Sequence, residues 1–156
     1  MEQITERIEE EHDEQKLALE EREPETESEQ EPECKGAHIR LGRRGEKAAR
    51  DFLMRHGIDV IDMNWTCPAG EVDIVAWDGC TLRFVEVKTR KSTGRGFPEE
   101  AVTPEKRARY ERIAEYYLQD FGKTEISVTF DIIGILVNGP DRAFLRYHRD
   151  AFGKDY

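Results

Sequence analysis

The stretch from Gly70 to Lys88 reads GEVDIVAWDGCTLRFVEVK, and it decides the fold class. Two runs rich in Val, Ile, Phe and Trp, residues 71–77 and 81–88, flank the dipeptide Asp78-Gly79. Such a dipeptide between apolar runs is a strong signal for a β-hairpin with a two-residue loop. The sequence therefore predicts two antiparallel strands joined at Asp78-Gly79.

The pattern on either side of this hairpin predicts two helices and three further strands. Apolar spacing, Thr103 as an N-cap before Pro104, and glycines after each helical run mark the helix ends. The predicted elements are a helix over 40–56, a strand over 58–65, a helix from Thr103 to about Phe121, and strands over 126–137 and 143–148. This order, αβββαββ, predicts an α/β fold in which helices flank a mixed β-sheet.

The charge of the chain is divided unevenly. Residues 1–35 hold 15 acidic and four basic residues, whereas the remaining residues hold 19 acidic and 20 basic. The segment 20–33 is nearly all Glu, Pro, Ser, Thr and Gln, which buries too little apolar surface to fold. We expect an acidic tail over 1–36, disordered or loosely helical, and a domain over 37–156 whose near-neutral charge allows a nucleic-acid partner.

The cysteines and the apolar runs exclude several classes of protein. The three cysteines are odd in number and show no C-x-x-C spacing, so we expect neither a disulfide framework nor a zinc site. No apolar run is long enough for a membrane span, and the N-terminus lacks the features of a signal peptide. We expect a soluble, cytoplasmic protein with no membrane partner.

The hairpin places charged residues together at its open end. With Asp78-Gly79 as the loop, Glu71 opposes Glu86, and Asp73 is a diagonal neighbour of Glu86 on the same face. Carboxylates this close repel one another, and a hard divalent cation with oxygen ligands would offset the repulsion. The geometry thus predicts a metal site at Asp73, Glu86 and Glu71, with Lys88 beside it.

A carboxylate-bound metal next to a lysine suits phosphodiester hydrolysis. The metal would polarise the phosphoryl oxygen and activate a water, and Lys88 would orient that water or stabilise negative charge. The competing interpretation is that Glu86 and Lys88 form an ordinary surface ion pair, because E-x-K alone is a weak signal.

The strings G-E-V-D at 70–73 and F-V-E-V-K-T-R at 84–90 resemble the PD-(D/E)xK nuclease superfamily with its restriction-endonuclease-like fold. From Leu41-Gly42-Arg43-Arg44-Gly45-Glu46 to about His148, the chain resembles the YraN-like family of predicted endonucleases, which are similar to archaeal Holliday-junction resolvases. The resemblance implies that Asp73 and Glu86 bind Mg²⁺ or Mn²⁺, that Lys88 is the catalytic lysine and that Glu46 reaches the same site. Val72 stands where the superfamily motif has proline.

Basic residues on three segments are candidates for contacts with nucleic-acid phosphates. They are Arg43 and Arg44 on the first predicted helix, Arg90, Lys91 and Arg95 around the loop after the hairpin, and Lys106 on the second helix. Each set alone is also typical of a solvated helix or loop. For Asp131, within a long apolar run, we expect a structural hydrogen bond.

Three functions follow from these patterns. The first is a metal-dependent endonuclease that hydrolyses DNA phosphodiester bonds, on branched or structured DNA. The second is a degenerate nuclease fold that binds nucleic acid without cutting it. The third is an interaction factor whose acidic tail contacts a basic partner or the domain itself. By analogy with resolvases, which cut two strands, the first function implies a homodimer.

Overall fold

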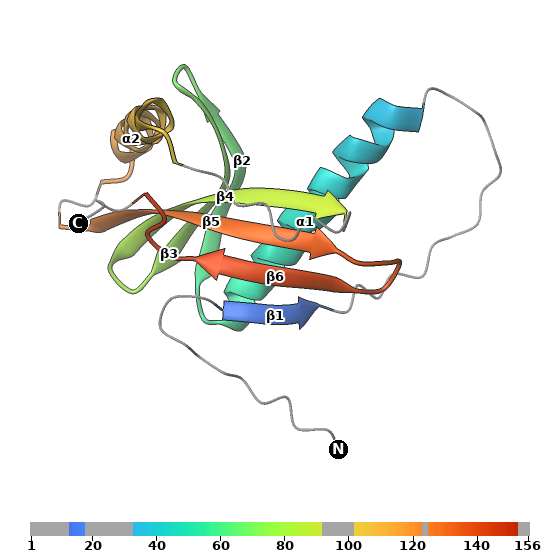
Figure 1. The fold of residues 1–156 in the computed structure, drawn as a ribbon. Helices are drawn as coiled ribbons and strands as arrows, with labels where there is room; N and C mark the ends of the chain where they lie inside the picture. Colours follow the sequence, from blue (N-terminus) through green and yellow to red (C-terminus); the bar gives the residue numbers. More distant parts are fainter. Residues whose placement is uncertain (1–12, 18–32, 92–101, 123–124, 153–156) are drawn as a thin grey trace.

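The computed structural model describes residues 13–17, 33–91, 102–122 and 125–152. Its elements are β1 (Asp13–Leu17), α1 (Glu33–Arg55), β2 (Asp59–Cys67), β3 (Gly70–Asp78), β4 (Thr81–Lys91), α2 (Pro104–Leu118), β5 (Ser127–Val137) and β6 (Ala143–His148). The strands form one sheet in the order β1-β6-β5-β4-β3-β2 (Figure 1).

The sheet is mixed, as the sequence predicts. β4 and β5 are parallel and are connected through α2, whereas every other neighbouring pair of strands is antiparallel. A parallel pair needs a crossover connection, and a helix is the usual one. The predicted α/β class and the predicted order of helices and strands from α1 to β6 are therefore confirmed.

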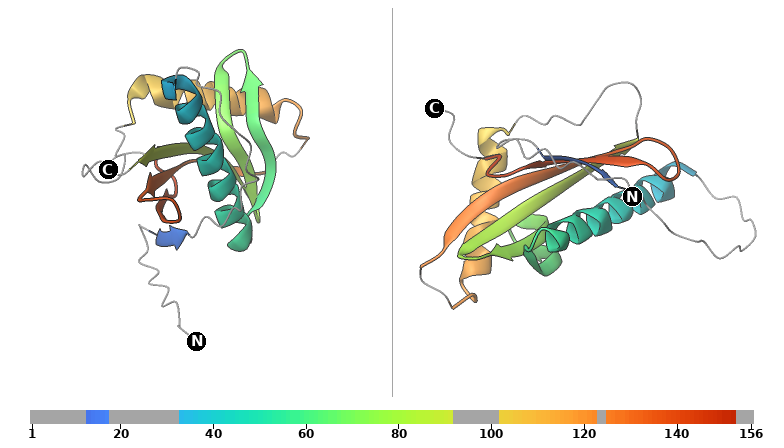
Figure 2. Two further views of the ribbon diagram at one scale, coloured as in Figure 1. Left: turned by 90° about the vertical axis from the view of Figure 1, so that its right-hand side faces the viewer. Right: turned by 90° about the horizontal axis from the view of Figure 1, so that it is seen from below.

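The two helices cover opposite faces of the sheet (Figure 2). Ala49, Phe52 and Leu53 of α1 pack with Ile74, Val85 and Ile133 on one face. Tyr110 and Ile113 of α2 pack with Leu82, Phe84 and Ile132 on the other face. Side chains along a strand alternate between faces, so β4 sends Val85 toward α1 and Glu86 toward α2.

Helix ends follow the predicted signals. Gly57 adopts a φ of 74°, and the amides of Gly57 and Ile58 bond the carbonyls of Met54 and Leu53, which closes α1 in a Schellman motif. Thr103 caps α2 by accepting a hydrogen bond from the Lys106 amide. No helix among the described residues is long and apolar enough to cross a membrane.

Two elements extend into the segment that the sequence assigns to the acidic tail. α1 begins at Glu33 rather than near residue 40, and β1 pairs with β6 at the edge of the sheet. The residues of β1, DEQKL, lack the β-branched and aromatic side chains that favour strands, so the sequence predicts no strand there. Residues 1–12 and 18–32 lie outside the described residues, and a disordered tail there stays a prediction.

The loop of the central hairpin is one residue later than the sequence predicts. Asp78 pairs with Thr81, so the two-residue loop is Gly79-Cys80 instead of Asp78-Gly79. Gly79, with a φ of 63°, takes the first loop position, where hairpin turns of one common type place glycine. The predicted pairing of Glu71 with Glu86 is therefore wrong. Because β4 is displaced by two residues, every side chain keeps its predicted face.

Candidate active site

Asp73 and Glu86 face each other where β3 separates from β4. The pairing of the two strands ends at Ile74 and Val85, whereas β4 continues beside β5 as far as Lys91. Continuing the register by one step brings Asp73 opposite Glu86. The Val87 amide, which has no β3 carbonyl to bond, donates to Asp73 Oδ2 over 2.7 Å. The two carboxylates therefore lie close together beyond the last strand pair, and Glu86 acts on the pKa of Asp73.

Glu86 is only 6% exposed, and both of its carboxylate oxygens are bonded. Lys88 Nζ lies 2.7 Å from Oε1, and Lys106 Nζ lies 2.7 Å from Oε2. The Tyr110 hydroxyl also donates to Oε2, over 3.1 Å. Lys106 and Tyr110 are one turn apart on α2, so both reach the same carboxylate.

Burial and nearby charges shift the pKa values of the Asp73 and Glu86 carboxyl groups in opposite directions. Burial raises the pKa of Asp73 to about 6, and the carboxylates of Glu46 and Glu86 add to this effect. Burial also acts to raise the pKa of Glu86, but the ammonium groups of Lys106 and Lys88 hold it below its usual value. In the opening between β3 and β4, Lys88 thus lowers the pKa of Asp73 less than burial and the neighbouring carboxylates raise it.

Glu46 reaches this opening from α1. Its carboxylate is close enough to act on the pKa of Asp73, and its Oε2 accepts a hydrogen bond from Asn64 Nδ2 over 3.1 Å. Asn64 adopts a φ of 52° and lies between Met63 and Trp65, which pair with Ile74 and Val72 on either side of Asp73. Glu46 thus lies near Asp73, and the role that the resemblance implies for it stays a prediction.

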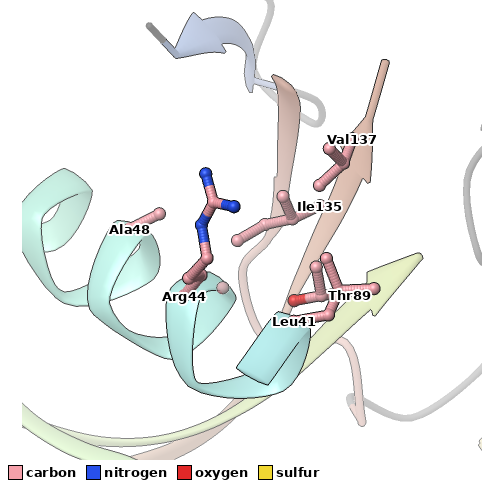
Figure 3. Close-up of a pocket in the computed structure, with 7 residues that line it drawn as sticks. Leu41, Arg44, Ala48, Thr89, Ile135 and Val137 are labelled. Carbon is pink, nitrogen blue, oxygen red and sulfur yellow. The ribbon is translucent and has the colours of Figure 1, made fainter. Parts of the chain in front are cut away.

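A close contact between α1 and β4 sets the position of Glu46. Gly45, the residue before it, packs against Thr89, and a Cβ at position 45 would lie 2.9 Å from Thr89 Cβ. Figure 3 shows Arg44 and Ala48 of α1 around an apolar pocket with Thr89 of β4 and Ile135 of β5. Glycine at position 45 therefore lets the helix lie directly on the strand that carries Glu86 and Lys88.

Glu71 does not join the carboxylates. It is exposed, and its strand neighbour is Thr66 of β2. The register that placed Glu71 opposite Glu86 is the one that the structure corrects. Asp73, Glu86 and Glu46 are the acidic residues that the structure brings together, and Lys88 lies beside Glu86 as the sequence predicts.

The candidate phosphate-binding residues fall into two groups. Arg43 and Arg44 on α1, and Arg90 and Lys91 at the end of β4, are all exposed. Lys106 is instead 12% exposed and is paired with Glu86, a contact that the sequence does not predict. Arg95 lies outside the described residues.

Three residues at the site escaped the sequence analysis: Tyr110, Asn64 and, in its role as a partner of Glu86, Lys106. No motif marks them, because Asn64 reaches the site from β2 and the other two reach it from α2, far in sequence from the E-x-K strand. The spacing of Lys106 and Tyr110, four residues apart on a helix that follows the E-x-K strand, is the signal that was available.

Asp131 has the structural role that the sequence predicts. It is fully buried and accepts hydrogen bonds from Arg83, from the Tyr147 hydroxyl and from the Asp150 amide. Arg83 is held in turn by Asp78 over 2.8 Å. The network joins β4, β5 and β6 on the α1 face and takes no part in the opening between β3 and β4.

The donor set around Asp73 suits a hard divalent cation, because it consists of carboxylate oxygens. The pKa of Asp73 is raised chiefly by burial, and the carboxylates of Glu46 and Glu86 add to the effect. In the described part of the chain, however, no three His, Cys, Asp or Glu side chains are placed to hold a metal ion together. The carboxylates fit the cation chemically, and a bond to Glu86 requires one of its ammonium partners to move.

Comparison with known proteins gives one family and many relatives. The model of the uncharacterised protein family UPF0102 matches residues 45–135, a range that includes Glu46, Asp73, Glu86, Lys88 and Lys106. A UPF0102 protein of Geobacter sulfurreducens is 42% identical over 80% of this chain and 99% of its own length. A UPF0102 protein of Rhodococcus jostii is 39% identical over 74% of this chain and 98% of its own length.

Proposed function

We propose that this chain, which belongs to the uncharacterised protein family UPF0102, is a metal-dependent endonuclease that hydrolyses phosphodiester bonds in DNA. The family is the YraN-like, PD-(D/E)xK-type group that the sequence predicts. The observation that carries the proposal is that Asp73 lies close to Glu86, while Lys88 Nζ lies 2.7 Å from Glu86 Oε1.

Each residue has a distinct role in this proposal. Asp73 and Glu86 would hold Mg²⁺ or Mn²⁺, and Glu46 would complete the acidic set. The bound ion would polarise a phosphoryl oxygen and lower the pKa of a water. Lys88, with a side chain 36% exposed, can reach a substrate and would orient the attacking water or stabilise charge on the phosphate.

The exposed basic residues support a DNA substrate. Arg44 and Thr89 line the same pocket (Figure 3), so Arg44 lies near the end of β4, where Arg90 and Lys91 follow Thr89 in the chain. Strand residues rise by about 3.3 Å each, which puts Arg90 roughly 13 Å from Glu86. A phosphate backbone that crosses Glu86 can therefore contact Arg90 on the same face of β4, while Arg44 lies beside the other face at the same end of the strand.

A second candidate function is a nucleic-acid-binding module that does not cut. The specific observation in its favour is that both carboxylate oxygens of Glu86 are already bonded to ammonium groups. A carboxylate that served only to hold Lys88 and Lys106 in place would have the same surroundings. This function needs the basic surface but no metal.

A cleavage panel distinguishes the two functions. Labelled single-stranded, duplex, flap and four-way-junction DNAs are incubated with the full chain and Mg²⁺, Mn²⁺ or EDTA. Asp73→Asn, Glu86→Gln and Lys88→Ala run alongside, and Asp59→Asn, an exposed carboxylate on β2, serves as the control. Metal-dependent cutting that only the first three variants lose supports the nuclease. Binding of these DNAs without product under any condition contradicts it and favours the binding module.

A further inference from the structure

Lys106 occupies the position beside Glu86 that a metal ion would need. Its ammonium group lies 2.7 Å from Glu86 Oε2, and Lys88 holds the other oxygen at the same distance. A divalent cation binds carboxylate oxygens directly, at about 2.0–2.6 Å. Oε2 can bond the ion strongly only if Lys106 withdraws.

The ammonium of Lys106 is held in a built environment rather than at a free surface. Lys106 is 12% exposed, and its Nζ lies 5.7 Å from the centroid of the Phe152 ring. The Lys106 amide bonds the Thr103 side chain, which fixes the first turn of α2. The aromatic face and the ordered helix turn place the positive charge at Glu86 without an external ligand.

The charges around Glu86 determine what removal of Lys106 would do. Asp73, Glu86 and Glu46 contribute three negative charges when ionised, and Lys88 and Lys106 contribute two positive charges. Loss of Lys106 makes the cluster more negative by one unit and removes the ammonium from Oε2, which still accepts from the Tyr110 hydroxyl. Both effects favour a divalent cation.

We infer that Lys106 acts as an internal counter-cation that competes with the divalent ion for Glu86 and so sets the metal affinity of the candidate active site. The inference rests on the proposed function, because it takes Asp73 and Glu86 as the metal ligands. Lys106 is thus a positioning residue in the metal-free protein, and the incoming ion displaces its ammonium group from Oε2.

The simpler role for Lys106 is to attach α2 to β4 and nothing more. Tyr110 provides a comparison within the same helix, because its hydroxyl donates to the same Glu86 oxygen without a charge. If attachment of α2 is the whole role, then loss of either side chain lowers thermal stability and neither change tightens metal binding. If Lys106 competes with the metal, only loss of its charge tightens binding.

The test is a titration of the full chain with Mn²⁺ alone, in which electron paramagnetic resonance measures the concentration of the free ion. The proteins are wild type, Lys106→Gln, Lys106→Arg, Tyr110→Phe and Arg112→Gln, the last removing one exposed positive charge elsewhere on α2. Circular dichroism melting identifies any variant that does not fold. We expect Lys106→Gln to bind Mn²⁺ roughly tenfold more tightly, as removal of a unit charge near the ion requires. Lys106→Arg, Tyr110→Phe and Arg112→Gln should stay within about threefold of wild type.

Each outcome of the titration either supports or overturns the role of Lys106. Unchanged or weaker Mn²⁺ binding by a folded Lys106→Gln, with measurable binding by wild type, overturns the competition but leaves the proposed nuclease intact. Equal tightening in Tyr110→Phe or Arg112→Gln overturns it as well, because charge beside Glu86 is then not the cause. Absence of Mn²⁺ binding in both wild type and Lys106→Gln overturns the metal-dependent function and the inference together.

Discussion

Gly45 of α1 packs so closely on Thr89 of β4 that a side chain at position 45 would overlap the threonine. A Cβ there would lie 2.9 Å from Thr89 Cβ and nearer still to its hydroxyl. Thr89 Oγ1 is buried and has no hydrogen-bond partner among the described residues. The contact fixes the distance between the helix that carries Glu46 and the strand that carries Glu86.

Gly45→Ala should therefore destabilise the domain, although alanine is the better helix former. Helix propensity alone would favour alanine by about 1 kcal/mol, whereas overpacking at a tight contact costs about 1–3 kcal/mol. Gly42→Ala is the matched control, because a Cβ at Gly42 meets nothing within 4 Å. Urea unfolding should show Gly45→Ala less stable than wild type and Gly42→Ala at least as stable. Equal effects of the two changes would contradict the packing argument.

The pKa of Asp73 predicts a specific pH dependence of stability in the absence of metal. The folded chain retains a proton on Asp73 up to about pH 6, whereas the ordinary pKa of an aspartate side chain is 3.8. The ionised carboxylate therefore lowers the free energy of unfolding as the pH rises from about 4 to above 6. Asp73→Asn should be more stable than wild type by about 1–3 kcal/mol at pH 7.5, and by little at pH 4.

Urea unfolding in EDTA at the two pH values measures this difference. Asp59→Asn, at an exposed position on β2, is the control and should show no such pH dependence. A constant difference between Asp73→Asn and wild type at both pH values would mean that the Asp73 carboxyl is not held in the environment that the structure shows.

Glu46 and Glu71 should differ sharply in cleavage assays. Glu46 lies near Asp73, and Glu71 is exposed away from it. If the proposed function holds, Glu46→Gln should lower the rate of metal-dependent cutting at least about tenfold, as loss of one charge stabilising the bound ion implies. Glu71→Gln should cut within about threefold of wild type. The reverse order would contradict the assignment of Glu46, rather than Glu71, to the candidate active site.

The hairpin shows how far the sequence determines this site. Alternation along the strands predicted correctly that Asp73 and Glu86 share a face, because that face survives any shift by two residues. The turn position was not predictable from Asp78-Gly79 alone. Asp78 lies in the strand, bonds Arg83 across the hairpin and leaves Gly79 to provide the positive φ. A contact between side chains thus decided between two loops that the local sequence allows.

The contribution of α2 could not be predicted for a different reason. Lys106 and Glu86 are separated by the loop and crossover that join β4 to β5, so their contact depends on where the helix settles on the sheet. Capping signals fixed the start of α2 at Pro104, and apolar spacing fixed its buried face. Neither signal indicates which residue of the sheet lies beneath the first turn of α2. The pairing of β1 with β6 is likewise a property of an open sheet edge and not of the residues DEQKL.

Loss of Asp131 should destabilise the fold without altering the candidate active site. Asp131→Ala leaves the largely buried guanidinium of Arg83 without one of its two carboxylate partners, and it leaves the Tyr147 hydroxyl unbonded. Removal of one partner of a buried pair costs about 3–5 kcal/mol. Urea unfolding should show a loss of this order, and the double variant Asp131→Leu/Arg83→Met should recover part of it. A loss below about 1 kcal/mol would show that the network is dispensable.

The basic surface predicts how DNA binding responds to salt. Each lysine or arginine that neutralises one phosphate contributes about one unit to the slope of log K against log salt concentration. Arg44→Ala and Arg90→Ala should each reduce the magnitude of that slope by about one, and the double variant by about two, because the residues lie on separate elements.

Arg55→Ala, which removes an exposed arginine from the last turn of α1, is the control and should leave the slope unchanged. Fluorescence anisotropy with a labelled duplex in EDTA gives these slopes, and they do not depend on whether the chain cuts DNA. If Arg44→Ala, Arg90→Ala and their double variant all show the wild-type slope, then nucleic acid does not lie along α1 and the end of β4. Both the nuclease and the binding module would then need a different substrate path.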